Sequence, residues 1–255
     1  MRESSPRTAI APIAMQVLGC EMDKEYEQRR RSIESQFETA AAIEASRSVE
    51  LSPSGKFKLT FDFYSRGTST WAYSRGRVTT TQDARLIADI KRNYSHFWHA
   101  WAQHANGNEY LLCGEDYQGQ TVVNLSCEAV QSFFPQAAYK GHGFCWTEAH
   151  PSPDSALRAV VGCYWGGPGE IVLFDFSNPD RLPYTECARV SDHLASIGWL
   201  DNETFEFTCE LDVRKSDGRA YEELSDAEQE VLDGTPDEIE CVQRRGTIAR
   251  VATQK

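Results

Sequence analysis

Turn-forming segments recur at a regular distance along this chain, and this repetition limits the fold more than any other feature. Each segment stands just before a run of strand-forming residues, and the spacing is roughly 45–50 residues. The segments are SPSG at Ser52–Gly55, HANG at His104–Gly107, HPSPDS at His150–Ser155 and LDNE at Leu200–Glu203. A tryptophan precedes three of these turns, and a cysteine follows each of the same three. The pattern predicts four copies of one β-sheet unit.

The residues after the turns have the alternation of β-strands. In KFKLTFDFY, Phe57, Leu59, Phe61 and Phe63 share one face, and polar residues take most of the other. Further strand-like runs follow, separated by Gly, Pro, Asn and Ser: TWAYSRGRVTTT, EYLLCGED, QTVVNLS, LRAVVGCYW, EIVLFDF and FEFTCELDV. A strand, a turn, a hairpin and an outer strand, repeated in this way, predict the blades of a propeller.

One repeat also resembles a known family. AHPSPDSALRAVVGCYWGGPGEIVLFDFSNP is similar to a blade of a WD-repeat β-propeller, with Phe174 and Asp175 where such blades carry Trp-Asp. The resemblance implies a binding scaffold, and it assigns no catalytic residue. We therefore expect an all-β, β-propeller-like fold of about four four-stranded blades, or five, with an N-terminal helix.

Two segments depart from the repeat. Residues 1–45 form a predicted arm and amphipathic helix, whose apolar positions over Glu21–Ala42 are spaced as on one helix face. We expect this helix to pack on the domain or to dock a partner. The propeller-like domain then covers residues 46–255. Its acidic insertion at about 222–240 has nine acidic residues and no basic one, and Ser225 with Glu228 predicts a capped helix over Asp226–Asp233.

Charge and cysteine content exclude several classes of protein. The formal net charge of −12 argues against nucleic acid or an anionic membrane as a partner. The eight cysteines include no C-x-x-C pair, which argues against structural zinc and favours a reduced, cytoplasmic protein. No run approaches the ~18 apolar residues of a membrane helix. Phosphate-binding loops, nucleophile elbows and H-E-x-x-H motifs are absent, so we expect no cofactor and no metal.

Histidines recur at the predicted links between blades, at His96, His142 and His193. Loops expected on the same rim add acidic and aromatic residues. The candidate ligand-binding set is His96, Glu115, Asp116, Tyr117, His142, Tyr164, Trp165 and His193. These side chains predict a pocket at the mouth of a central channel. Alternatively, each histidine holds two blades together through a backbone hydrogen bond.

The segment NYSHFWHAWAQH contains three histidines, but the predicted blade separates them. Residues 97–103 form the predicted inner strand, which sends Trp98 and His99 to opposite faces. His104 falls in a turn, where a structural role suffices. Of the three histidines in this segment, only His96 remains a candidate for ligand contact.

The function favoured by these patterns is a non-catalytic scaffold that binds a protein, a peptide or a small ligand on one rim. The alternative is a hydrolase or lyase that uses His96, His142, His193 and Glu115 as acid–base groups or metal ligands. A third hypothesis is an interaction protein that works through the acidic insertion or the N-terminal helix. We expect a monomer or a homodimer.

Overall fold

Antiparallel β-structure dominates the computed structural model, which describes residues 24–115, 119–135, 138, 143–164, 167–191 and 193–250. The strands form four separate sheets in chain order. Sheet 1 contains β1 (Ala41–Ala42), β2 (Ser48–Leu51), β3 (Phe57–Ser65), β4 (Ala72–Thr80) and β5 (Leu86–Arg92). Sheet 2 contains β6 (His99–Gln103), β7 (Glu109–Glu115), β8 (Gly119–Asn124) and β9 (Ala129–Phe133). Sheet 3 contains β10 (Phe144–Pro151), β11 (Leu157–Tyr164), β12 (Glu170–Asp175) and β13 (Glu186–Val190), and sheet 4 contains β14 (His193–Trp199), β15 (Thr204–Arg214) and β16 (Ile239–Ala249).

The four predicted turns confirm the repeat. Each joins the first long strand of a sheet to the second, and a backbone hydrogen bond closes it, such as Ser52 N–H to Phe57 O at 2.9 Å. Gly55 and Gly107 have positive φ values of 72° and 86°, a conformation that a side chain would strain. The predicted fold of about four four-stranded blades is confirmed, and the strand number differs only in the two end sheets, 1 and 4. Sheet 1 gains the short β1, and in sheet 4 the chain leaves β15 for the acidic insertion and returns as β16, the last strand described.

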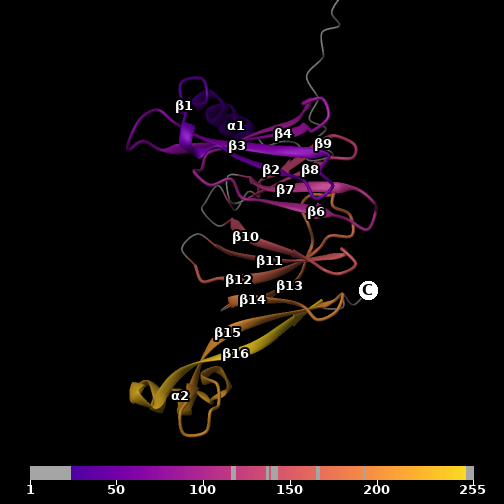
Figure 1. The fold of residues 1–255 in the computed structure, drawn as a ribbon. Helices are drawn as coiled ribbons and strands as arrows, with labels where there is room; N and C mark the ends of the chain where they lie inside the picture. The colour runs from indigo at the N-terminus through magenta and orange to yellow at the C-terminus, as the bar shows by residue number, and fades with distance from the viewer. Residues whose placement is uncertain are drawn as a thin grey trace, which may run out of the picture.

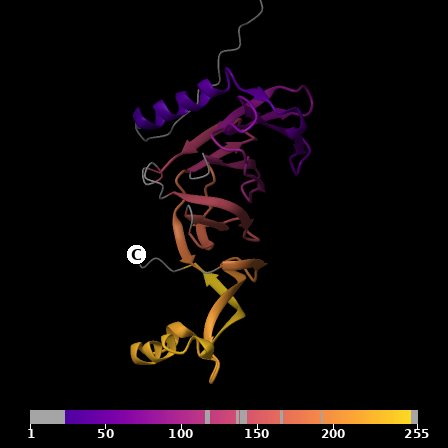
Figure 2. The ribbon, with the colours of Figure 1, turned by 90° about the vertical axis from the view of Figure 1, so that its left-hand side faces the viewer.

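The sheets stack face to face, so the fold is propeller-like (Figures 1 and 2). Alternation within β11 shows why the stack forms. Val160 packs against sheet 2, while Ala159 and Val161 pack against sheet 4, and all three are buried. Both faces of this strand are therefore apolar, as its continuous run of small hydrophobic residues requires. The junction of sheets 1 and 2 is filled in the same manner by Leu59, Val78 and Leu111.

The stack is open, because sheets 1 and 4 lie at its opposite ends (Figures 1 and 2). The outward face of sheet 1 is polar: Asp62, only 1% exposed, accepts hydrogen bonds from Arg47 Nε at 2.8 Å and Arg77 Nη2 at 2.7 Å. On sheet 4, Glu206 pairs with Arg245 at 3.4 Å. Polar outer faces let a stack end without a further neighbour.

The N-terminal helix α1 (Lys24–Gln36) ends before the predicted Ala42, and residues 21–23 of the predicted helix lie outside the described residues. Tyr26 and Ile33 are buried as predicted. The helix ends early because the chain turns back to sheet 1. There Phe37 packs on the rings of Tyr64 and Tyr73 at 5.1 and 5.8 Å, and β1 pairs with β3.

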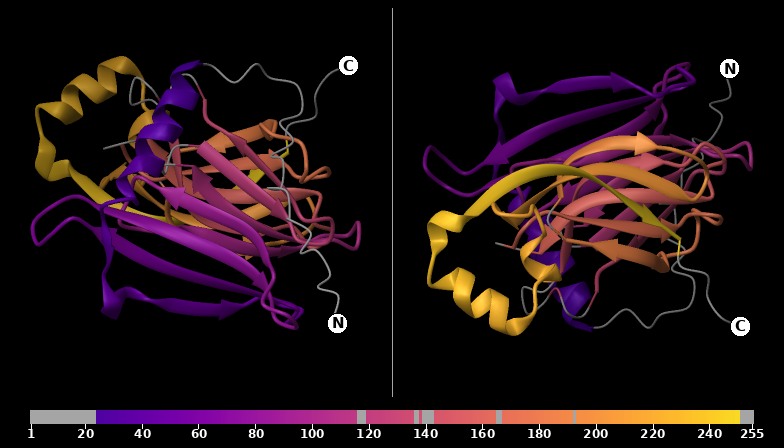
Figure 3. Two further views of the ribbon diagram at one scale, coloured as in Figure 1. Left: turned by 90° about the horizontal axis from the view of Figure 1, so that it is seen from above. Right: turned by 90° about the horizontal axis from the view of Figure 1, so that it is seen from below.

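The acidic insertion projects beyond the edge of the sheets at the end of the β15–β16 ribbon (Figure 3). Its helix α2 (Asp226–Asp233) forms over the predicted residues, with the Ser225–Glu228 capping box present. Arg214 and Arg219 both pair with Asp217 and Glu228, and these ion pairs fasten the insertion to the ribbon. No helix of the described chain is long and apolar enough to span a membrane.

We predict that Asp62→Ala lowers the free energy of unfolding by about 2 to 3 kcal/mol, because it leaves two arginines without their shared buried acceptor. Asp89→Ala is the matched control. Asp89 lies on the same face but pairs with Arg75 alone, and its side chain is 27% exposed. The control should lose less than about 1 kcal/mol in chemical denaturation. Equal losses for the two variants would contradict the role given to Asp62.

Candidate functional site

The two ends of the strands form two rims with different contents. The link rim carries the connections between sheets, such as residues 93–98. The turn rim carries the turns after the first strand of each sheet, at residues 52–56, 104–108, 152–156 and 200–203. The sequence predicted a site on the link rim. Four of its residues, Asp116, Tyr117, His142 and Trp165, lie outside the described residues, and for Glu115 only the backbone at the end of β7 is described.

His96 is exposed on the link rim and lines a pocket of about 220 Å³ between sheets 2 and 3. The wall is mainly aromatic, with Tyr94, Phe97, Trp98 and Trp146. The rings of Trp98 and Trp146 meet edge to face at 5.6 Å. Trp98 Nε1–H also donates to Thr147 O at 2.9 Å, so it joins sheet 2 to sheet 3. His96 thus places an imidazole beside an aromatic pocket.

Tyr164 belongs to a different group of side chains. Its ring lies 5.5 Å from that of Phe144, and the guanidinium of Arg189 stands over both rings at 5.3 and 5.1 Å. Glu170 and Glu186 hold Arg189 in this position. These contacts give Tyr164 a packing role on sheet 3.

His193 joins a hydrogen-bonded chain between sheets 3 and 4. Its Nε2 lies 3.3 Å from Ser196 Oγ, and that hydroxyl lies 3.2 Å from Glu148 Oε2. His150 Nε2 approaches the same carboxylate oxygen at 2.9 Å. Burial lowers the pKa of His193, the charge of Glu148 opposes this shift, and His150 adds to it. The sequence identified His193 but missed its three partners.

In the described part of the chain, no hydrogen bond or ring contact joins His96, Tyr164 and His193 to one another. Nor do three His, Cys, Asp or Glu side chains of those residues group closely enough to hold a metal ion. The described link-rim residues therefore occupy three separate places.

Of the predicted histidines, His193 makes a backbone hydrogen bond between sheets, from its N–H to Gly169 O at 3.2 Å, and residues outside that set add others. Asn106 N–H donates to His104 Nδ1 at 3.1 Å, so His104 carries its proton on Nε2 and donates it to Phe176 O at 3.1 Å. Trp199 Nε1–H donates to His150 O at 3.1 Å. His104 thus has the structural role that its turn position suggested.

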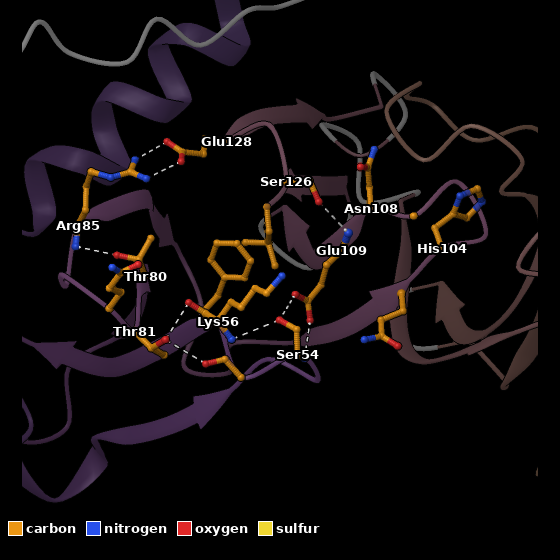
Figure 4. A pocket seen from close by; sticks show the side chains of 16 residues that line it. Ser54, Lys56, Thr80, Thr81, Arg85, His104, Asn108, Glu109, Ser126 and Glu128 are labelled. Carbon is orange, nitrogen blue, oxygen red and sulfur yellow. Dashed lines mark hydrogen bonds and ion pairs between the residues drawn. The ribbon is translucent and has the colours of Figure 1, made fainter.

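The larger cavity lies on the turn rim, between sheets 1 and 2 (Figure 4). This turn-rim cleft has a volume of about 890 Å³, and four turns of two sheets form its walls. The lining side chains are mostly hydroxyls, amides and charged groups, with Phe57 and Leu125 as apolar members. The repeat predicted that these turns lie at one end of the stack, but the turn residues themselves indicated only a structural role.

Most charged groups of the cleft already have partners. Glu109, 7% exposed, accepts from Ser54 N–H at 3.1 Å and from Ser54 Oγ–H at 2.6 Å. Arg85 donates to Glu128 through two nitrogens, one of them at 2.6 Å, which lowers the pKa of Glu128. The Ser54–Glu109 and Arg85–Glu128 contacts therefore join sheets 1 and 2, and His104 is engaged with Phe176 of sheet 3.

Lys56 differs from these groups. Figure 4 shows its side chain extended into the cleft between Thr80 and Thr81 on one side and Glu109 on the other. Among the described residues its ammonium makes no ion pair, and the side-chain amides of Gln82 and Gln103 make no hydrogen bond with protein atoms. A cation and two amides are therefore available to a ligand.

Comparison with known proteins places the chain in a family. No protein-family model matches it. Over 213 residues it is 30% identical to the uncharacterized protein R762 of Acanthamoeba polyphaga mimivirus, an alignment that covers 80% of this chain and 82% of that protein. The chain belongs to the family of this viral protein.

Among solved structures, the crystal structure of the Myceliophteria thermophila Cps50 (Swd1) β-propeller domain is similar, with a TM-score of 0.37 and 11% sequence identity. The match covers 65% of this chain and 48% of that one, so the chain spans about half the length of that domain. A likeness this distant adds nothing about function.

The lowered pKa of His193 predicts a stability that depends on pH. The folded protein binds the proton of His193 more weakly than the unfolded chain, whose histidines titrate near pH ~6.5. This contribution is complete above that pH and is lost as the pH falls. We therefore expect His193→Gln to flatten the decrease in unfolding free energy between about pH 7.5 and about pH 5.5, measured by denaturant titration. Glu148→Gln removes the charge that raises the pKa of His193, so it should make the decrease in unfolding free energy steeper. The same pH dependence in the wild type and both variants would show that His193 is not its source.

Proposed function

We propose that this protein is a non-catalytic binding protein that holds an extended peptide in the turn-rim cleft. One observation carries the proposal. The cleft is large and polar, yet its acid–base groups already have protein partners, whereas Lys56, Gln82 and Gln103 are available among the described residues. A catalytic site needs groups that can exchange protons with a substrate, whereas a recognition site needs fixed donors and acceptors.

The available groups suit a peptide that carries a carboxylate. A side-chain amide donates through its NH2 group and accepts through its carbonyl oxygen, so it can form hydrogen bonds with both the C=O and the N–H of a peptide group. With Glu109 covered by Ser54 and Arg85 neutralised by Glu128, Lys56 supplies the charge that a ligand meets in the cleft. An acidic side chain or a C-terminal carboxylate is its complement. Phe57 offers an apolar surface beside these groups.

Charge reversal at Lys56 tests the proposal. Peptides selected from a random displayed library on the wild-type protein should bind Lys56→Glu at least about tenfold more weakly, because attraction to the carboxylate becomes repulsion. Fluorescence anisotropy with the labelled peptides measures this change. Lys56 is exposed, and its side chain makes no hydrogen bond or ion pair with the described residues, so the variant should fold normally.

Lys58→Glu is the matched control, since it makes the same charge change two residues away, on β3 and outside the cleft. It should keep wild-type affinity. If both variants bound the peptides equally weakly, the loss would come from the overall charge of the protein and not from the cleft. If the selected peptides bound Lys56→Glu as tightly as wild type, the cleft would have no role in binding. If no peptide were selected, but a small carboxylate bound to the wild-type protein and not to Lys56→Glu, the ligand of the cleft would be a small molecule instead of a peptide.

The hydrogen-bonded chain of His193, Ser196, Glu148 and His150 supports a second candidate, a hydrolase. Ser196 Oγ–H donates to Glu148 Oε2 at 3.2 Å, and His193 Nε2 lies 3.3 Å from the same hydroxyl. Turning that proton toward His193 would give the arrangement that activates a serine nucleophile. Hydrolysis of p-nitrophenyl esters, lost in both Ser196→Ala and His193→Gln, would favour this function. Activity that is absent in wild type, or that persists in both variants, would eliminate it.

A further inference from the structure

Two cysteines of sheet 3 lie directly opposite each other on neighbouring strands. Cys145 on β10 pairs with Cys163 on β11 in the antiparallel ladder, so their side chains leave the sheet on the same face. Opposite residues of such a ladder have Cα atoms about 4.5 or 5.5 Å apart, and disulfides span about 4.4 to 6.8 Å. Both residues are free thiols in this structure. The pairing of these two backbone positions is therefore compatible with a disulfide.

The other sheets show that this juxtaposition is specific to sheet 3. The corresponding strands of sheets 2 and 4 also pair a cysteine near the link rim, but its partner is a histidine: His99 opposite Cys113, and His193 opposite Cys209. The fold therefore places a cysteine beside a different side chain in each sheet. Only in sheet 3, among the described strands, are both positions cysteine.

The two thiols differ in their access to small reagents. Cys145 is 8% exposed, and Cys163 is half-buried. Burial raises the pKa of the Cys145 thiol to about 11, and the nearby Cys163 adds to this shift. Because the thiolate is the reacting species and access is needed, Cys163 meets an oxidant first and Cys145 serves as the resolving thiol.

We propose that Cys145 and Cys163 are an oxidation site, at which a small hydroperoxide converts the pair to a cross-strand disulfide. Hydrogen peroxide first oxidises Cys163 to a sulfenic acid and releases one water. The Cys145 sulfur then attacks the Cys163 sulfur, forming the S–S bond and displacing the hydroxyl as a second water. In sum, two thiols and one hydrogen peroxide give one disulfide and two waters, and a dithiol reductant reverses the change.

The disulfide would form at the wall of the aromatic pocket. Both cysteines line the 220 Å³ pocket with His96, Trp98 and Trp146. Forming the bond draws the two sulfurs together to about 2.05 Å and ties β10 to β11 beside the tryptophans. The oxidation state of this pair therefore sets the shape of the link-rim pocket, independently of the turn-rim cleft.

Peptide mapping of the full-length protein tests the site. The reduced protein is treated with hydrogen peroxide while folded, blocked with N-ethylmaleimide in denaturant, and digested with trypsin. Cleavage after Arg158 separates the two cysteines into peptides 141–158 and 159–181, so a disulfide appears as a link between these peptides. We expect this link, with the loss of the maleimide adducts at Cys145 and Cys163 and their return after dithiothreitol.

Cys163→Ser and Cys209→Ser are the matched variants. Cys163→Ser should lose the link and retain the adduct at Cys145, whereas Cys209→Ser should oxidise as wild type does. The wild-type protein alone decides the matter if a variant fails to fold. Maleimide adducts retained on both cysteines after peroxide, a link that joins either of them mainly to another cysteine, or oxidation of both to sulfinic acid without a link would overturn the proposal.

Discussion

Burial of both faces of the inner sheets is the constraint on which this structure depends. A sheet whose strands are apolar on both faces needs a neighbour on each side, and β11 shows the consequence, because Val160 faces sheet 2 while Ala159 faces sheet 4. The stack can stop only where a sheet has one polar face. Asp62, buried between two arginines, provides such a face on sheet 1, so four sheets form an open stack.

Stacking also determines where ligand chemistry can occur. Strand ends from two neighbouring sheets meet at each rim, and the spaces between them become pockets. On the turn rim, Ser54 and Glu109 from adjacent sheets bond to each other and leave a polar cleft beside them. On the link rim, Trp98 and Trp146 meet across the junction and leave an aromatic pocket. The same architecture thus produces two pockets of opposite character: a polar cleft, in which we propose that a peptide binds, and an aromatic pocket lined by Cys145 and Cys163.

The architecture could be predicted from the sequence because it rests on local patterns. Turn residues at regular spacing and alternation in each strand predicted four blades, and Ser225 with Glu228 predicted α2 to the residue. The site was harder to predict, because the blade scheme assigns a residue to a rim but not to a neighbour. The sequence assigned His96 and His193 to similar positions, but His96 precedes β6 and lines an aromatic pocket, whereas His193 begins β14 and contacts Ser196. The repeat determines where a residue lies along the stack, but its neighbours differ from one sheet junction to the next.

The sequence by itself determined the kind of element, the number of sheets and the polar or apolar character of each strand face, since these follow from residue spacing and local backbone preference. Only the tertiary structure decided which side chains meet. Glu148 reaches Ser196 across 48 positions of sequence, and Cys145 faces Cys163 because a register shift between Trp146 and Glu148 sets the pairing of β10 with β11. Contacts of this kind depend on the stagger and twist of neighbouring strands, which no pattern within one strand records.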